Sequence, residues 1–424
     1  METKKFKVVT LGCRTNQYES QAYTDQLLSL GMSQALETDV AEICVVNTCT
    51  VTESADSSSR HQIRQLAKQN PGAKILVTGC LAERDPNSIG QIEGVTHVVP
   101  NTRKESLLQE IFPEEELPEF SIKSFEAHTR AFVKVQDGCN SFCTYCIIPY
   151  VRGRSRSRRL SEIIEEIKTL VSNGYKEIVL TGINIGDFDG APQEGEAPVR
   201  LAELVRTVDQ VEGVERIRVS SIDPDEVDEE LIDAVIQGKS TCHSFHIVLQ
   251  SGSNVILKRM NRKYTKEVFL STIERLKKAS PDFTFTTDII VGFPGESEAD
   301  FTDTLEIMEK VRFAKVHMFP YSERKRTRAA LFPGKVTPQV MQQRKRKLLT
   351  LAETASFALR EEYLGRKMKV LIESEEKDQK GVFSGHTENF LPVLVEGADL
   401  VSNQIVEVEL IENTQTALMG RRLR

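Results

Sequence analysis

Residues 131–149 read AFVKVQDGCNSFCTYCIIP, an apolar and β-branched run followed by a glycine and three cysteines. The first five residues have the composition of a buried β-strand. Cys139, Cys143 and Cys146 come soon after it, within one short loop. Barrels of parallel strands carry their chemistry at the carboxyl ends of the strands, so this loop is the first candidate for a functional site.

The spacing of these cysteines points to an iron–sulfur centre. Three thiolates can hold three irons of a [4Fe–4S] cluster, whereas a cluster held only by protein needs four. One iron is then open to a ligand from outside the protein, as is the fourth position of a catalytic zinc ion. Two alternatives stay open, a zinc site short of one ligand and three unrelated buried cysteines. We predict that Cys139, Cys143 and Cys146 are the catalytic cluster ligands.

The same β/α rhythm continues after this loop. Helical patterns such as LSEIIEEIKTLVSNG (160–174), with apolar positions on one face, separate the strand-like runs. Five further strand-like runs follow AFVKV (131–135), and the six runs with their helices predict an incomplete TIM-type (β/α)6 barrel over residues 125–355. The further strand-like runs are EIVLTG (177–182), RIRVSS (216–221), FHIVLQ (245–250), FTTDIIVG (285–292) and KVHMF (315–319).

The N-terminal part, residues 1–115, predicts a smaller domain with a parallel α/β sheet. Its strand-like runs are FKVVTLG (6–12), EICVVNT (42–48) and KILVTG (74–79). Each run is followed directly by a cysteine, namely Cys13, Cys49 and Cys80. The carboxyl ends of parallel strands share one edge of a sheet, so these thiols can meet there. The alternative is three small buried residues at strand ends, which is also how we interpret Cys44 inside its strand.

The C-terminal residues 358–424 change character. Strand-like runs joined by turn residues, RKMKVLIES (366–374), GVFSGHTENFLPVLVEG (381–397) and QIVEVELIE (404–412), predict a small all-β, OB-like barrel. One long amphipathic helix over residues 337–365 joins it to the preceding domain, and FPEEELPEF (112–120) is a linker.

Composition and charge narrow the function classes. The net charge of -7 gives no global basic field, but basic residues cluster, as in RGRSRSRR (152–159). We expect that run to meet an RNA backbone, the alternative being a solvated charge run. The sequence has no apolar run that could span a bilayer and no signal peptide at its start, so we expect a cytoplasmic protein without membrane contact. Patterned cysteines in that compartment indicate metal or catalysis rather than disulfides.

The CxxxCxxC loop resembles the signature of radical S-adenosylmethionine (SAM) enzymes, whose fold is an incomplete β/α barrel. Further segments resemble the methylthiotransferase family of that superfamily along essentially the whole chain, including a C-terminal TRAM domain. They are LGCRTNQYES (11–20), VVNTCTVTESADSSSR (45–60), VTGCLAERDP (77–86), LQSGSNVILKRMNRKYT (249–265), TTDIIVGFPGESEADF (286–301) and PYSERKRTRAA (320–330).

This resemblance implies two [4Fe–4S] clusters and SAM as cofactors. One cluster would bind SAM at Cys139, Cys143 and Cys146, and an auxiliary cluster at Cys13, Cys49 and Cys80 would supply sulfur. Polar groups at strand ends would contact SAM, and Tyr145 would pack on its adenine; the alternative for each strand-end group is capping or turn formation. The strand-end candidates are Thr181, Gly182, Asn184, Ser220, Gln250 and Asp288.

The segments around Cys13 and Cys49 resemble the family branch that adds a 2-methylthio group to N6-threonylcarbamoyladenosine at position 37 of tRNA. Arg14 and Thr15 match neither of the other branches, which act on isopentenyladenosine 37 or on an aspartate of ribosomal protein S12. Residues 326–329 depart from the usual motif of the threonylcarbamoyladenosine branch. Both other substrates stay open as alternatives, as does a non-enzymatic RNA-binding iron–sulfur protein.

The implied partners are the tRNA anticodon stem-loop, a flavodoxin- or ferredoxin-like electron donor and an unidentified sulfur donor. In the C-terminal unit, Phe383 and Phe390 are candidates for stacking on RNA bases.

Overall fold

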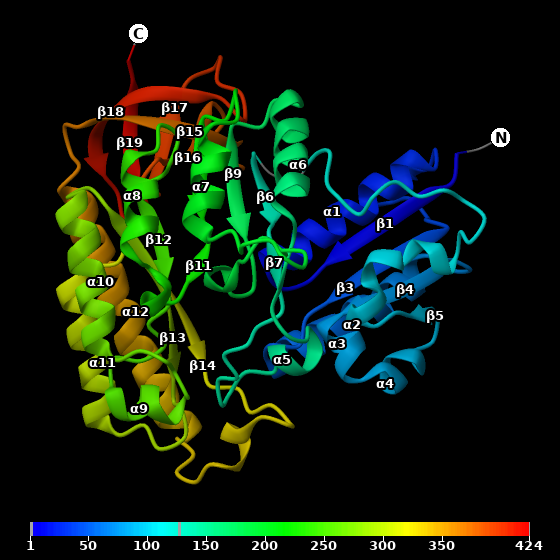
Figure 1. The fold of residues 1–424 in the computed structure, drawn as a ribbon, viewed down its shortest axis with the longest axis horizontal. Coiled ribbons are helices and arrows are strands. Elements are labelled where there is room, and N and C mark those ends of the chain that lie inside the picture. The colour runs from blue at the N-terminus through cyan, green and yellow to red at the C-terminus, as the bar shows by residue number, and fades with distance from the viewer. Residues whose placement is uncertain (1–2, 126–128, 424) are drawn as a thin grey trace.

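A computed structural model describes residues 3–125 and 129–423. The chain forms three units (Figure 1): an N-terminal α/β unit in blue and cyan, a central barrel in green and yellow, and a C-terminal β-barrel in orange and red. Across the described ranges, no helix is long and apolar enough to cross a membrane.

The N-terminal unit is a parallel sheet with the strand order β2-β1-β3-β4-β5. In register, Thr10 faces Asn47 and Thr48 faces Gly79, so the carboxyl ends of the three longest strands are level. The three runs predicted from the sequence are confirmed, and two shorter strands complete the sheet. The strands are β1 Lys5–Thr10, β2 Ser33–Gln34, β3 Ile43–Thr48, β4 Lys74–Gly79 and β5 Val95–Val98.

Helices cover both faces of this sheet. The side chain of Thr52 caps the second helix by accepting a hydrogen bond from the Ala55 amide, which fixes where the chain turns after β3. The helices are α1 Arg14–Ser29, α2 Glu53–Gln69, α3 Cys80–Arg84 and α4 Pro86–Gly90, followed by the short turns η1 Asn101–Ser106 and η2 Leu108–Glu110.

The central unit confirms the incomplete β/α barrel. Its six parallel strand positions fall in two hydrogen-bonded sheets, β10-β9-β6 and β11-β12-β13-β14, because Ser220 interrupts the third strand. β6 and β14 are the free edges of these sheets, so the barrel is not closed between them. The strands are β6 Arg130–Lys134, β9 Glu177–Thr181, β10 Arg216–Val219, β11 Ser221–Ile222, β12 Ser244–Ile247, β13 Thr284–Val291 and β14 Lys315–Pro320.

Amphipathic helices cover the outside of the barrel. In α6, Leu160–Ser172, the side chains of Ile163, Ile167 and Leu170 are fully buried in the main core, as the apolar stripe predicted. The other helices are α5 Ile148–Val151, α7 Leu201–Asp209, α8 Glu229–Gln237, α9 Asn254–Arg259, α10 Lys266–Ala279 and α11 Glu298–Val311. A hairpin of β7 Gln136–Asp137 and β8 Arg156–Ser157 brackets the cysteine loop, and η3 Ile185–Asp187, η4 Pro224–Glu226 and η5 Arg328–Leu331 are short turns.

The C-terminal unit is a closed barrel with the order β15-β16-β17-β19-β18, which confirms the all-β prediction. A 24-residue helix, α12 Pro338–Glu361, leads into it along the central unit. The last strand was not predicted: the terminal basic residues Arg421 and Arg422 lie in it and pair with Glu409 and Asp399. The strands are β15 Lys367–Glu375, β16 Val382–Thr387, β17 Pro392–Glu396, β18 Ile405–Asn413 and β19 Leu418–Arg422.

Candidate active site

The loop that carries Cys139, Cys143 and Cys146 is held by one hydrogen bond of its own and by two other segments of the chain. The Cys146 amide donates to the Cys143 carbonyl at 3.0 Å, and the Thr144 amide donates to the Met260 carbonyl at 2.9 Å. The Ala329 amide, from the segment after β14, donates to the Thr144 carbonyl at 2.8 Å. Burial, followed by the neighbouring Cys143, raises the pKa of the Cys146 thiol to about 12. The three thiols are therefore mutual neighbours on a braced loop.

Hydrogen-bond donors point at two of these sulfurs. The Arg262 Nη1 lies 3.1 Å from the Cys143 Sγ, and the Ser141 amide lies 3.4 Å from the Cys139 Sγ. Donors of this kind stabilise thiolate over thiol, and they tune the potential of iron–sulfur clusters. The donor set fits a cluster on this loop.

Cys13, Cys49 and Cys80 lie at the level carboxyl ends of β1, β3 and β4. A Cβ atom on Gly12 would come within 2.9 Å of the Cys49 Sγ, so the loop that contains Cys13 is in close contact with the Cys49 side chain. Burial raises the pKa of the Cys49 thiol to about 11, and the charges of Cys80 and Cys13 act in the same direction. The sheet thus brings together three cysteines that are far apart in sequence.

Neither trio surrounds a single point. Within residues 3–125 and 129–423, no three His, Cys, Asp or Glu side chains are disposed around one metal-ion position. A four-iron cluster takes each cysteine on a different iron, so its ligands need not converge as those of a single ion do. The chemistry of the six thiols, rather than a preformed ion site, is what fits two clusters.

The two cysteine loops adjoin one cavity of about 170 Å³. Val51 and Thr52, which follow Cys49, form part of its wall, and Tyr145 and Cys146 form another part. Cys80 packs directly against Ile147 and Val151, the residues that follow Cys146. One chamber is therefore lined by both the N-terminal unit and the barrel.

The predicted strand-end residues divide into two groups. Tyr145, Gln250 and Asp288 line the cavity. Gln250 has a φ of 61°, and its buried Oε1 has no hydrogen-bond partner among the residues that the structure describes. Such a side chain fits a polar ligand, because an unsatisfied buried group is costly. The Asp288 carboxylate is partly exposed and lies 3.3 Å from the His246 Nε2.

The remaining four predicted residues, Thr181, Gly182, Asn184 and Ser220, do not line the cavity. Thr181 is buried at the end of β9, and the backbone N–H of Asn184 donates to the Gln136 Oε1 at 2.9 Å. A Cβ on Gly182 would meet the same oxygen at 2.9 Å. Within the described part of the chain, the buried Ser220 hydroxyl has no hydrogen-bond partner, as is the case for the Gln250 amide oxygen. This group adjoins β10 and the turn that contains Glu226.

A carboxylate pair on that side was not predicted. Burial, then the nearby charge of Asp223, raises the pKa of Glu226 to about 7. Asp223 in turn pairs with Arg262, which links this group to Cys143. The segment MNRKYT, already noted for its family resemblance, contains Arg262, but nothing in its spacing predicted a bond to a cysteine.

Two of the five arginines in the basic run 152–159 are taken up by ion pairs inside the protein and are not part of the RNA-binding surface expected from the sequence. The Arg152 side chain is fully buried and pairs with Glu19 on α1 at 3.1 Å and with Asp137 at 2.9 Å. Arg158 pairs with Glu166 at 2.6 Å. Arg152 and Arg158 are structural, because their carboxylate partners are buried in the same interface. Arg154, Arg156 and Arg159 are exposed, so RNA contact through them stays a prediction.

The same buried network joins the two cysteine-bearing units. Lys104 of η1 contacts both Glu19 and Asp137, so each cation bridges the same two carboxylates. Burial alone would raise the pKa of Glu19, but Arg152, Lys104 and Lys134 lower it to about 2. The network therefore fixes the N-terminal sheet against the loop that begins at Asp137.

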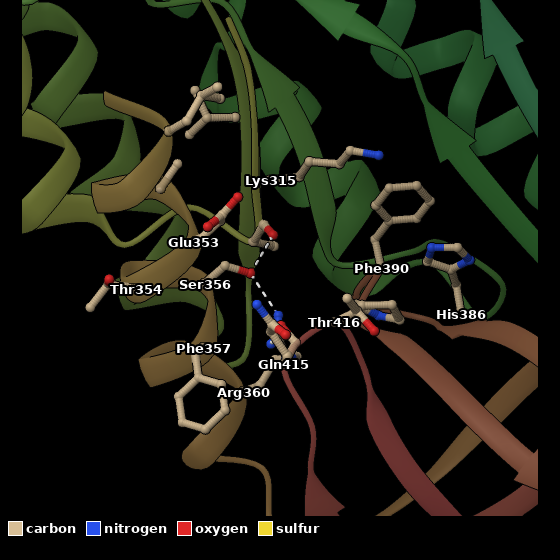
Figure 2. Close-up of a pocket in the computed structure, with 15 residues that line it drawn as sticks. Lys315, Glu353, Thr354, Ser356, Phe357, Arg360, His386, Phe390, Gln415 and Thr416 are labelled. Carbon is tan, nitrogen blue, oxygen red and sulfur yellow. Dashed lines mark hydrogen bonds between the residues drawn. The ribbon is translucent and has the colours of Figure 1, made fainter. Parts of the chain in front are cut away.

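A second hollow, of about 680 Å³, lies between β14, α12 and the C-terminal barrel (Figure 2). It is lined by Lys315 at the amino end of β14, whereas Phe319 and Pro320 at the other end of that strand line the chamber beside Cys146. It is thus at the end of the barrel remote from the cysteines. The ring of Phe390 in this hollow stacks on the ring of His386, with their centres 4.5 Å apart, so that face of Phe390 is not available to an RNA base. RNA stacking by Phe383 stays a prediction.

Comparisons with known proteins agree with this architecture. A family model described as the Radical SAM superfamily matches residues 133–308, and one described as Uncharacterized protein family UPF0004 matches residues 5–100. A solved structure of a radical SAM methyltransferase, TsrM from Kitasatospora setae, has a TM-score of 0.54 and 13% identity, covering 76% of this chain and 75% of its own. At that identity the likeness concerns the fold alone.

Sequence relatives cover nearly the whole chain. A Chlamydia pneumoniae protein named threonylcarbamoyladenosine tRNA methylthiotransferase MtaB is 48% identical, over 98% of this chain and 97% of its own. The Bacillus subtilis protein of the same name is 37% identical, over 95% and 93%. A Finegoldia magna protein named tRNA-2-methylthio-N(6)-dimethylallyladenosine synthase is 34% identical, over 98% and 94%.

Proposed function

The chain belongs to the methylthiotransferase family of radical SAM enzymes, and we propose that it adds a methylthio group to C2 of N6-threonylcarbamoyladenosine 37 in tRNA. As a radical SAM enzyme it uses an iron–sulfur cluster and SAM. The two more similar relatives described above carry the threonylcarbamoyladenosine name, which favours that substrate over the dimethylallyl one.

One observation carries the proposal: loops from both cysteine trios adjoin the same chamber. We propose a [4Fe–4S] cluster at Cys139, Cys143 and Cys146, and an auxiliary one at Cys13, Cys49 and Cys80. When bound, the first would supply the electron for reductive cleavage of SAM, and the second would supply the sulfur. Inserting a methylthio group at an unactivated C–H needs both functions next to one substrate carbon.

The chain's own residues would bind and enclose the reactants. Arg262 holds its guanidinium on the Cys143 sulfur. The unpartnered oxygens of Gln250 and Ser220 are suited to SAM's polar groups, and Tyr145 offers an aromatic wall. The segment after β14, through Ser322 and Ala329, ties the barrel to α2 and to the cysteine loop and so forms one wall of the chamber. Thr181, Gly182, Asn184 and Asp288 remain candidate SAM contacts of the same proposal.

The proposal includes the organisation and partners of the enzyme. We assign residues 1–115 to the auxiliary-cluster domain, 125–355 to the radical SAM core and 358–424 to a TRAM domain. The substrate is a tRNA anticodon stem-loop, whose single-stranded bases are accessible to an enzyme. A flavodoxin- or ferredoxin-like protein would supply electrons in the cytoplasm, and the sulfur donor is a separate partner.

Nucleoside analysis tests the substrate. Deleting the gene should abolish 2-methylthio-N6-threonylcarbamoyladenosine in bulk tRNA and leave its unmethylthiolated precursor. Mass spectrometry of ribosomal protein S12 from the same strain should show no change. Persistence of the modified nucleoside, or loss of an S12 modification instead, contradicts the proposal. Absence of 5′-deoxyadenosine after anaerobic reconstitution with dithionite and SAM would favour the non-enzymatic iron–sulfur protein.

Cys80→Ala tests the auxiliary cluster. The variant should lose about half of the reconstituted iron and all methylthiolated product, but keep reductive SAM cleavage, because the radical SAM cysteines are untouched. Cys44→Ala is the matched control, since Cys44 is fully buried in the core of the same sheet and should keep its iron. Full iron content in Cys80→Ala would exclude Cys80 as a ligand.

A further inference from the structure

Arg14 lies where the barrel is open. It is the first residue of α1, directly after Cys13, and its guanidinium is 5.6 Å from the ring centre of Phe132 on β6. Its charge also acts on His317 of β14. β6 and β14 are the two free edges of the incomplete barrel. The guanidinium therefore occupies the seam between those edges, on the side that faces the N-terminal unit.

This cation has no carboxylate of its own. Throughout residues 3–125 and 129–423, no Asp or Glu lies within salt-bridge distance of the Arg14 guanidinium, and the guanidinium forms no hydrogen bond, although the side chain is half-buried. Of the acidic groups nearby, Glu177 pairs with Arg218 at 2.8 Å, and Asp288 contacts His246 rather than Arg14. The positive charges of Arg130 and Arg218 repel it further. A half-buried cation among other cations favours an anion from outside the chain.

Asp288 is a neighbour of both the seam and the chamber. Asp288 lines the cavity beside Cys146, and it is also close enough to Arg14 for their charges to interact. A group held by Arg14 would therefore lie next to a reactant placed between the two cysteine loops. Phe132 supplies an apolar surface under the guanidinium, which limits its hydration.

We propose that Arg14 binds the carboxylate of the threonylcarbamoyl group and so selects that nucleoside over one with an apolar prenyl group. The inference rests on the proposed function and specifies its substrate contact. The threonylcarbamoyl group differs from a prenyl group chiefly in its carboxylate and hydroxyl. Arg pairs with carboxylates through two parallel hydrogen bonds, which gives both affinity and orientation. Because the substituent sits on N6, anchoring it orients the purine and hence C2.

Binding measurements on the reconstituted enzyme test this role. Three synthetic anticodon stem-loops would carry N6-threonylcarbamoyladenosine, its neutral methyl ester or N6-isopentenyladenosine at position 37. Arg14→Gln should weaken binding of the acid by about 10- to 100-fold, and leave the ester and the isopentenyl RNA unchanged. Arg14→Lys should retain part of the preference, since it keeps the charge but loses the bidentate geometry.

Arg64→Gln is the matched control, because Arg64 is an exposed arginine of α2 in the same domain and its loss removes the same charge. It should keep the wild-type preference for the acid over the ester. An unchanged preference in Arg14→Gln overturns the inference. So does a weakened affinity for SAM measured without RNA, which would assign Arg14 to the SAM carboxylate.

The proposed function fails separately. Absence of methylthiolated product from the wild-type enzyme with the acid-bearing RNA would contradict that function. The acid-to-ester binding ratio of wild type and Arg14→Gln would still decide whether Arg14 holds the carboxylate.

Discussion

Glu226 is a partly exposed carboxyl group in an acidic surrounding. Burial comes first in raising its pKa from 4.5 to about 7, and the charges of Asp223, Asp187 and Asp225 add to it, while Asn184 opposes them by donating a hydrogen bond. The folded state therefore holds a proton that the unfolded chain releases at lower pH. The stabilisation of the folded state by this bound proton is fully present below pH 4.5, and it is lost as the pH rises through about 7.

Glu226→Gln mimics the protonated form and should remove that loss. We expect the variant to be more stable than the wild type at pH 8 by about 1–2 kcal/mol, after allowance for solvent at this site. The difference should shrink toward zero as the pH falls to 4.5. Urea unfolding at several pH values measures it. Glu203→Gln, at an exposed carboxylate of α7, is the control and should show no such trend. A constant difference for Glu226→Gln across the pH range would contradict the assignment.

The residues around the cysteines differ in how visible they are in the sequence. The grouping of six thiols into two sets could be predicted, because three share one loop and three follow strands of one sheet; their role as cluster ligands stays a prediction. Arg152 could not, because its carboxylate partner Glu19 is 133 positions away and the arginine stands in a run that looks solvated. The same holds for Arg262, whose contact with Cys143 spans 119 positions. Ligand residue types leave a local signal, whereas the partners that orient them depend on tertiary packing.

At the scale of elements, the junction of β4 and α3 depends on Gly79. Its φ of 92° and ψ of -169° lie in a region that is essentially restricted to glycine. A Cβ there would lie 2.4 Å from the Thr48 carbonyl oxygen, on the neighbouring strand β3. The glycine thus lets β4 end close enough to β3 for Cys80 to start the next helix beside Cys49.

Gly79→Ala should therefore both strain the backbone and force β3 and β4 apart. We expect a loss of more than about 3 kcal/mol in the free energy of unfolding, together with loss of auxiliary-cluster iron. Gly72→Ala is the control, because Gly72 has a φ of 83° but no atom within 4 Å of the added Cβ. It carries the backbone strain alone and should cost about 1 kcal/mol. Equal losses in the two variants would show that the contact with β3 is unimportant.

The regular elements were predicted where a periodic pattern lasted for a full strand or helix. All six barrel strand positions and the three main strands of the N-terminal sheet have such patterns. β2 has only two residues, and β19 is hidden in a basic tail whose arginines pair with acidic neighbours. These strands exist because of their partners in the sheet and not because of their own residues.

At the scale of the whole molecule, buried charges cross the boundary between the N-terminal unit and the barrel. Glu19 and Lys104 come from one side, and Asp137 and Arg152 from the other, with all four side chains at most 5% exposed. Removing one partner of a buried pair leaves the other uncompensated, which is far more costly than losing a solvated pair. The two cysteine-bearing units are therefore expected to unfold as one body, with the cysteine trios held at a fixed separation.

A double-mutant cycle on Glu19→Gln and Arg152→Met measures this coupling in the full chain. Each single variant should lose about 3–5 kcal/mol in the free energy of unfolding. The double variant should lose less than the sum, because neither charge is then left buried without its partner.

The control cycle is Lys310→Met and Glu274→Gln, an exposed pair at 3.2 Å, whose coupling should be below about 0.5 kcal/mol. A Glu19–Arg152 coupling no larger than the control value would contradict a rigid, charge-locked interface. Two separate unfolding transitions in the single variants, against one in the wild type, would identify the network as what joins the units, since Lys104 and Asp137 alone would then no longer hold them together.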